Sequence, residues 1–185
     1  YDRNKLLLIA SGEVELENLR DNSTIFTEEL IFDNNLKKII SKKKATFKDN
    51  NNNQLSTDKF SYDVKTSIAK IDTLKLQDSQ KNEYFLEKSF LNMKTKKLVG
   101  KDVFVNLENL VSGNNFRIKS LGIEKDNNIT VMNKAVFTPC KKNGNCPPWQ
   151  LAAKKITHDK EKKIMSYKNA WLKIYNQPVL YFPSF

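Results

Sequence analysis

Histidine is almost absent from this chain, because only His158 among its 185 residues is a histidine. A single histidine removes most Ser-His-Asp triads, Cys-His pairs and metal sites built from several histidines. The five glycines are isolated, so no glycine-rich loop is present to cradle a phosphate group. Asp159 and Glu161 have the chemistry of an acid/base pair, but they lie in a lysine-rich turn where we expect both to be exposed and ionised. We therefore predict a protein that is not an enzyme and that uses no metal or cofactor.

Long apolar runs are missing as well. The longest, Leu6 to Ala10, is far shorter than the ~20 residues that a helix needs to span a membrane. Apolar residues make up 39% of the chain and charged residues 29%, a balance that favours thin β-sheets over a thick multilayer core. The length suits a single domain. The chain opens at Tyr1 without a signal-peptide pattern, so we interpret it as a fragment or a mature form.

Alternating apolar and polar residues are the main pattern that the chain does contain, and this period of two is typical of half-buried strands. The clearest cases are residues 6–17, 73–77, 103–107 and 116–119. Segments rich in Asn and Asp separate them and are typical of turns. Helical patterns are weak, and we expect at most short helices in Thr27–Leu36, Ser79–Phe90 and Lys160–Tyr175.

A repeat runs through the chain. In each of six units, an aromatic or aliphatic residue and then an acidic or amide residue precede a polar turn. The pairs are Tyr1-Asp2, Phe32-Asp33, Tyr62-Asp63, Leu91-Asn92, Ile123-Glu124 and His158-Asp159. Each unit is too short for two strands joined by a crossover helix but suits two strands and two turns. The repeat predicts an all-β stack of strand pairs, in which His158 fills the structural position of Phe32 and Tyr62.

The chain is strongly basic, with a formal net charge of +11 at pH 7. Most of this charge is dispersed lysine, with small clusters at Lys42–Lys44 and around Lys160. Such a surface favours anionic partners. A solvated basic surface without any specific site accounts for the charge equally well.

The last forty residues, Cys146 to Phe185, are the most distinctive and contain PPWQ, ITHDKEK, NAWLK and PVLYFP. This segment resembles the LptD family of outer-membrane lipopolysaccharide assembly proteins, also called organic solvent tolerance proteins. The similarity is dense from Thr138 to Phe185. Residues 9–16, IASGEVEL, are similar to the recurrent strand of the wider OstA/LptA superfamily, and looser similarity covers most of the remainder.

The resemblance implies a twisted antiparallel β-jellyroll of about six two-strand repeats over residues 1–176. Residues 177–185 would be a linker into the first strand of an outer-membrane barrel. The implied function is lipopolysaccharide transport and assembly on the periplasmic side of the outer membrane. The implied partners are lipopolysaccharide, an LptA-like bridge protein added at a sheet edge and an LptE-like lipoprotein bound through the barrel. No nucleic-acid partner is expected.

Two features near the C-terminus have more than one interpretation. Cys140 and Cys146 flank a polar loop with an Asn-Gly turn signal, and we predict a local disulfide in the oxidising periplasm that the resemblance implies. Free thiols or, by resemblance, bonds to barrel cysteines are the alternatives. An aromatic cluster forms either a domain-end core or, by resemblance, the junction with the barrel. The junction candidates are Trp171, Tyr181, Phe182 and Pro183.

The alternating strands either bury their apolar faces against one another or hold them apart as a groove for acyl chains. A groove gains ~0.8 kcal/mol for each methylene that it removes from water. We predict the groove, with ordinary core as the alternative. The candidate lining residues are Val14, Leu16, Phe32, Phe47, Phe60, Leu74, Leu76, Phe90, Val105, Phe116, Ile118 and Val131. Two other functions remain open: a soluble LptA-like or LptC-like bridge protein with the same ligand, and a basic β-sheet module that binds polyanions.

Overall fold

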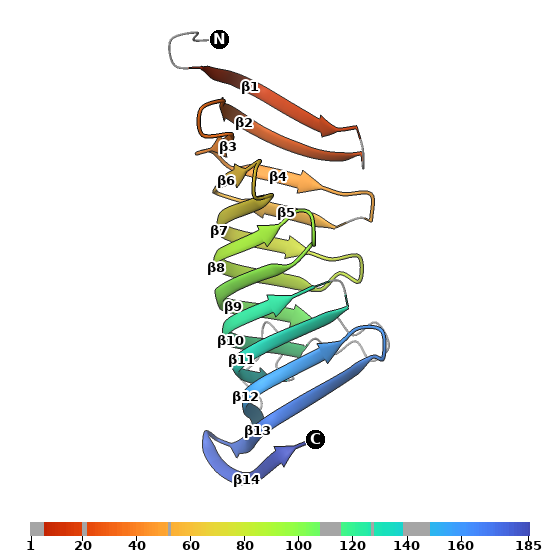
Figure 1. Cartoon of the computed structure of the whole chain (residues 1–185). Coiled ribbons are helices and arrows are strands. Elements are labelled where there is room, and N and C mark those ends of the chain that lie inside the picture. The colour runs from red at the N-terminus through yellow and green to blue at the C-terminus, as the bar shows by residue number, and fades with distance from the viewer. Residues whose placement is uncertain (1–5, 20–21, 52, 108–115, 127, 139–148) are drawn as a thin grey trace.

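The computed structural model describes residues 6–19, 22–51, 53–107, 116–126, 128–138 and 149–185. These residues form fourteen strands in one antiparallel sheet and contain no helix (Figure 1). The chain is thus a twisted antiparallel β-jellyroll, and the all-β prediction is confirmed. The strands are β1 (Leu7–Asn18), β2 (Ser23–Asp33), β3 (Lys38–Ser41), β4 (Ala45–Lys48), β5 (Gln54–Thr57), β6 (Lys59–Asp63), β7 (Ile68–Gln77), β8 (Glu83–Asn92), β9 (Leu98–Leu107), β10 (Phe116–Lys125), β11 (Ile129–Thr138), β12 (Trp149–Asp159), β13 (Ile164–Ile174) and β14 (Gln177–Ser184).

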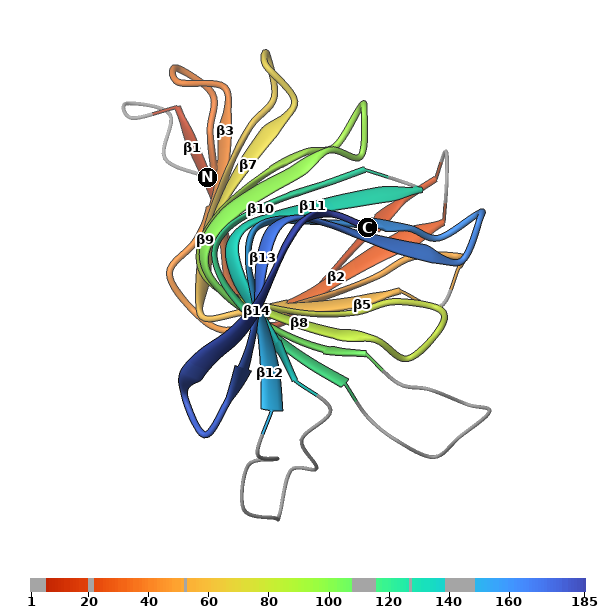
Figure 2. The same ribbon diagram turned by 90° about the horizontal axis from the view of Figure 1, so that it is seen from below.

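Each long strand from β7 to β13 bends at a corner, so that the sheet folds into two arms, which Figure 2 shows along the stack. One residue per strand drops out of the pairing register at the corner, and the buried side of the strand shifts by one residue there. In β8, for example, Tyr84 and Leu86 are buried before the corner and Ser89 after it. The residues that drop out are Thr73, Glu87, Asp102, Leu121, Lys134, Lys154 and Asn169.

The expected short helices are absent because all three segments are extended. Thr27–Leu36 lies in β2 and the turn after it, Ser79–Phe90 lies mostly in β8, and Lys160–Tyr175 lies mostly in β13. The corner explains part of the helical pattern, since buried residues on its two sides stand three apart, as Tyr167 and Ala170 do in β13. No helix among the described residues is long and apolar enough to cross a membrane.

The corner has a different form in the N-terminal half of the sheet, where the chain stops and restarts. β3 ends at Ser41 before β4 begins at Ala45, and β5 ends at Thr57 before β6 begins at Lys59. Buried hydroxyl groups satisfy backbone carbonyls at these breaks. The hydroxyl of Thr27 donates to the carbonyl of Lys44 at 3.1 Å, and that of Thr57 donates to the carbonyls of Lys59 and Asp72.

Two rows of cross-strand partners run across the sheet, one on each arm, and partners in a row share one face. The Leu55 row consists of Leu16, Ile25, Phe47, Leu55, Leu76, Tyr84, Val105, Ile118, Phe137, Leu151, Leu172 and Leu180. The Tyr62 row consists of Leu8, Phe32, Ile39, Tyr62, Ala69, Leu91, Leu98, Lys125, Thr130, His158 and Met165. His158 thus lies in the same row as Phe32 and Tyr62, which agrees with its place in the repeat.

The repeated acidic or amide residues cap the turns at one end of the strands. The side-chain oxygens of Asp33, Asp63, Asn92 and Asp159 each accept a hydrogen bond from a backbone N–H two or three residues further on. The fifth unit differs from the prediction, because Asp126 caps the turn and Glu124 does not. Glu124 lies within β10, and its carboxylate is 3.5 Å from the amine of Lys97.

The C-terminal segment is part of the sheet. Residues 177–184 form β14, which pairs with β13, and the backbone of Phe185 exchanges hydrogen bonds with Tyr167. The expected linker over 177–185 is therefore a strand that continues the domain. Apolar residues such as Val179 and Leu180 let this segment pair as a strand, and Pro183 is accommodated because β14 lies at an edge, where a missing N–H is tolerated.

Candidate binding groove

An apolar cavity of about 500 Å³ lies between the two rows in the N-terminal half of the sheet. The Leu55 row contributes Leu16, Ile25, Phe47 and Leu55 to its wall, and the Tyr62 row contributes Ile39, Tyr62, Ala69 and Leu91. Phe60 and Ile71, close to the corner, also belong to the apolar lining, as do Ala45 and Met93. The broken corner strands thus hold two apolar faces apart here.

A second cavity of about 610 Å³ adjoins the first, since Phe47, Leu55, Leu91, Met93 and Lys96 border both. Its inner wall is apolar and includes Leu74, Leu76 and Leu98. Charged and amide side chains gather along its other side, and they come from five separate turns or the strand ends next to them. We call the two cavities together the groove.

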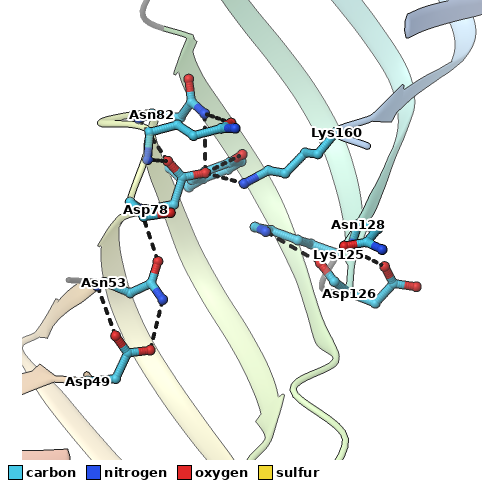
Figure 3. Close-up of polar contacts among 11 residues, drawn as sticks. Asp49, Asn53, Asp78, Asn82, Lys125, Asp126, Asn128 and Lys160 are labelled. Carbon is cyan, nitrogen blue, oxygen red and sulfur yellow. Dashed lines mark hydrogen bonds and ion pairs between the residues drawn. The ribbon is translucent and has the colours of Figure 1, made fainter. Parts of the chain in front are cut away.

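Two matching turns border the second cavity at the tip of one arm. In each, an aspartate accepts hydrogen bonds from the backbone and side-chain amide of the asparagine four residues later, in the pairs Asp49–Asn53 and Asp78–Asn82 (Figure 3). The side-chain oxygen of Asn53 also accepts a hydrogen bond from the backbone of Ser79 at 3.1 Å, which joins the two turns. This polar edge is therefore held by local hydrogen bonds.

Asp78 also bonds across the groove to Lys160, which follows β12 on the other arm. Both side chains are largely buried, with 5% of Asp78 and 14% of Lys160 exposed. Burial raises the pKa of Asp78, but hydrogen bonds and charge from Lys160 and hydrogen bonds from Asn82 outweigh it and lower the pKa below its usual 3.8. The sheet twist brings these turns together although they are 82 residues apart in sequence.

Lys125 is the inward-facing cation of the Tyr62 row. Its amine lies 5.4 Å from the ring centre of Tyr84, and its hydrogen-bond partner is the backbone carbonyl of Asp126 at 3.4 Å. Burial, followed by the charge of Lys160, lowers the pKa of Lys125 to about 8. Burial and the charge of Asp78 raise the pKa of the Tyr84 hydroxyl, which donates to Asp78 at 3.4 Å. Lys160 is thus paired with Asp78 at this end of the groove, and the charge of Asp78 also acts on Lys125, which has no ion pair with it.

The rows close into a solid core beyond Tyr84. Val105, Ile118 and Ile156 are fully buried, and Tyr84 and Met132 are 1% exposed. These side chains belong to a continuous cluster that begins at Leu55 and Leu74 in the groove wall and extends to Tyr167 and Ala170. The C-terminal half of the sheet therefore has an ordinary core where the N-terminal half has a groove.

The predicted lining residues separate into four groups. Leu16, Phe47, Phe60, Leu74 and Leu76 line the groove. Val105, Phe116 and Ile118 belong to or pack against the closed core, which is the alternative that the alternation left open. Val14 and Phe32 are half-buried on the inner face, as their partners Thr27 and Ile39 show, but they do not border the cavities.

Phe90 and Val131 were assigned wrongly. Phe90 is 51% exposed, because the shift at the corner of β8 turns Ser89 inward in its place. Val131 stands between Thr130 and Met132, both 1% exposed, so it faces the opposite side of β11. A polar residue holds the inward position in each case, and alternation of apolar residues does not reveal such a position.

The C-terminal candidates also divide. Phe182 packs against the core cluster, as a domain-end core requires. Trp171 and Tyr181 are 43% and 44% exposed and lie with ring centres 5.0 Å apart, and Pro183 is exposed beside them in β14. Cys140 and Cys146, with their predicted disulfide, lie outside the described residues.

Several groove residues were missed by sequence reasoning. Leu55 and Ile39 lie in four-residue strands too short to show alternation. Lys125 was missed because lysine is normally a surface residue. The Asp-x-x-x-Asn spacing at residues 49–53 and 78–82 is a visible signal of the paired turns, but nothing in the sequence connects Asp78 with Lys160. No protein-family model matches the chain, and no curated protein sequence matches it.

Proposed function

We propose that the groove binds acyl chains of lipopolysaccharide and that the domain hands this lipid on at the periplasmic side of the outer membrane, as an LptD-like jellyroll. The strongest support is the change along the Leu55 row, in which Leu16 to Leu76 border open cavities although the next members, Tyr84, Val105 and Ile118, are fully buried. The cavity volumes fall in the range of ~300–1,000 Å³ that is usual for ligand sites. An apolar wall of this kind gains free energy from each methylene that it covers.

The charge of the chain and the edges of the sheet are compatible with the same role. The net charge of +11 attracts an acidic lipid towards the domain. Among the described strands, β1 pairs only with β2, so its other side is open to strand addition by an LptA-like bridge protein. An LptE-like lipoprotein would bind through a barrel that follows the domain. We propose no chemistry on the ligand.

Site-specific photocrosslinking tests the acyl-chain site. A crosslinking residue at Leu55 or Phe60 should capture lipopolysaccharide, because both side chains border the groove. The same residue at Lys75, which is exposed on the outer face of β7, or at the sealed Ile118 should capture none. Equal labelling of Phe60 and Lys75, or no labelling at either groove position while the domain still binds the lipid, would refute the proposal.

A further inference from the structure

The two lysines at the end of the groove carry an inference that rests on the proposed function. We propose that Lys125 and Lys160 form a binding site for the acidic head group of an amphiphile, a phosphate or carboxylate oxyanion, whose alkyl chain lies in the second cavity. The site belongs to the chain's own architecture, since Lys125 and Lys160 both border that cavity together with Leu74, Leu76 and Leu98.

The charges at this point are unbalanced. Figure 3 shows Lys125 and Lys160 reaching into one gap from the same side, with Asp78 opposite them. Asp78 is paired with Lys160 and has further hydrogen bonds from Asn82 and Tyr84. Lys125 has no carboxylate within ion-pair distance among the described residues. A half-buried cation without a counterion is costly, and an oxyanion in the cavity would supply one.

The other charged groups at the cavity leave this role open to Lys125. Asp126 is exposed, and one of its oxygens already accepts hydrogen bonds from two backbone N–H groups. The two oxygens of Asp49 accept three hydrogen bonds from Asn51 and Asn53. The amine of Lys125 has three N–H donors and one weak acceptor, so donors remain for a ligand.

The position of Lys125 also matches the shape of such a ligand. Leu98 is its cross-strand partner in the Tyr62 row, and Leu91 precedes Leu98 in that row. An alkyl chain that follows the row through the second cavity therefore ends at the Lys125 amine. Charge-assisted hydrogen bonds to phosphate or carboxylate are strong in a partly desolvated site.

Four probes test the site on the whole chain: dodecyl phosphate, dodecanol, dodecyltrimethylammonium and inorganic phosphate, titrated by calorimetry. We expect dodecyl phosphate to bind about tenfold more tightly than dodecanol, and the cationic amphiphile to bind most weakly. Lys125→Gln should lower the affinity for dodecyl phosphate to about that for dodecanol. The matched control is Lys75→Gln, which removes an exposed lysine from the outer face of β7 and should change neither affinity.

The pH dependence gives a second measurement. The titratable groups near Lys125 are Lys160, Asp78, Asp126, Tyr84 and His158. Because the pKa of Lys125 is about 8, the preference for dodecyl phosphate should decline above pH 8 in the native chain and be flat in Lys125→Gln. Thermal unfolding of the variant checks that it is folded.

The outcomes separate the two proposals. If dodecanol binds and dodecyl phosphate binds no more tightly, the head-group site is refuted and the apolar groove stands. If inorganic phosphate binds as tightly as dodecyl phosphate, the site binds free phosphate, and the proposal that its ligand is an amphiphile is wrong. If none of the alkyl compounds binds, the groove itself is refuted and the head-group site falls with it.

Discussion

The Leu55 row has the same kind of side chains in both halves of the sheet, but it lines cavities in one half and a closed core in the other. In the N-terminal half, Leu16 to Leu76 of the Leu55 row border cavities, whereas Tyr84, Val105 and Ile118 of the same row are sealed. The continuity of the strands at the corner also differs between the two halves. Strands β7 to β13 run through it with one unpaired residue each, but β3/β4 and β5/β6 are broken there. The first cavity lies beside these broken strands, and the second extends along β7 to β9, which run through the corner.

The comparison is tested most strongly by placing a charge in each half. Ile118→Asp buries an unpaired carboxylate in the closed core and should lower the free energy of unfolding by ~4 kcal/mol or more. Phe60→Asp adds the same group to the groove, where water can reach it, and should cost ~1–2 kcal/mol while abolishing lipid binding. Urea unfolding measures both. Equal losses would mean that the groove is sealed in solution and that the halves do not differ.

A smaller effect is expected where the halves meet. Asp78→Asn removes the ion-pair partner of Lys160 and the nearest negative charge that acts on Lys125, and it should cost about 3 kcal/mol. Asp49→Asn is the matched control, because it changes the same kind of turn without a lysine partner and should cost about 1 kcal/mol.

The stability at low pH tests whether the charge of Asp78 is responsible for its contribution. Since its pKa is lowered in the folded chain, its contribution is complete above the unfolded value of 3.8 and is lost as the pH falls through the folded pKa. The stabilities of the native chain and of Asp78→Asn should therefore begin to converge as the pH falls below about 3.8 and become equal only below the folded pKa. A constant difference down to the lowest pH would show that the lost stability does not come from the ion pair.

The smallest effect tests the close packing of the sealed half. A Cβ at Gly100 would lie 2.1 Å from a terminal carbon of Leu86 and 3.2 Å from the carbonyl oxygen of Lys88. Leu86 is buried and has little room to move, so Gly100→Ala should cost ~1–2 kcal/mol. Gly122→Ala, whose Cβ would find its nearest atom at 3.7 Å, should change stability by less than ~0.5 kcal/mol. Similar midpoints for the two variants in thermal unfolding would contradict the tight packing.

The strand architecture could be predicted because each hairpin encodes its own alternation and turn. Asp33, Asp63, Asn92 and Asp159 were identified as turn residues and cap turns in the structure. What a local pattern does not contain is the corner. The one-residue shift at the corner of β8 turns Ser89 inward, where alternation predicted Phe90. Across the corner, buried residues also stand at a spacing that suggested helices.

The candidate site was predictable only in part, for a physical reason. Leucine, isoleucine and phenylalanine occur in grooves as well as in cores, so the sequence could not distinguish the groove residue Phe60 from the core residue Ile118. The separation of the two arms decides between them, and it depends on contacts between distant turns. Lys125 and the Asp78–Lys160 pair belong to that same long-range level, and their residue types alone indicate a solvated surface.

The order of the strands has a consequence for how the chain is made. From β7 to β14 every strand pairs with its immediate neighbours in sequence, so each new pairing closes only a short loop and loses little chain entropy. The sheet can therefore assemble hairpin by hairpin in the order of synthesis, with the strand already in place acting as the template for the next. At each stage the newest strand presents an unpaired backbone edge, and the partly made protein is most open to wrong pairing at that moving end.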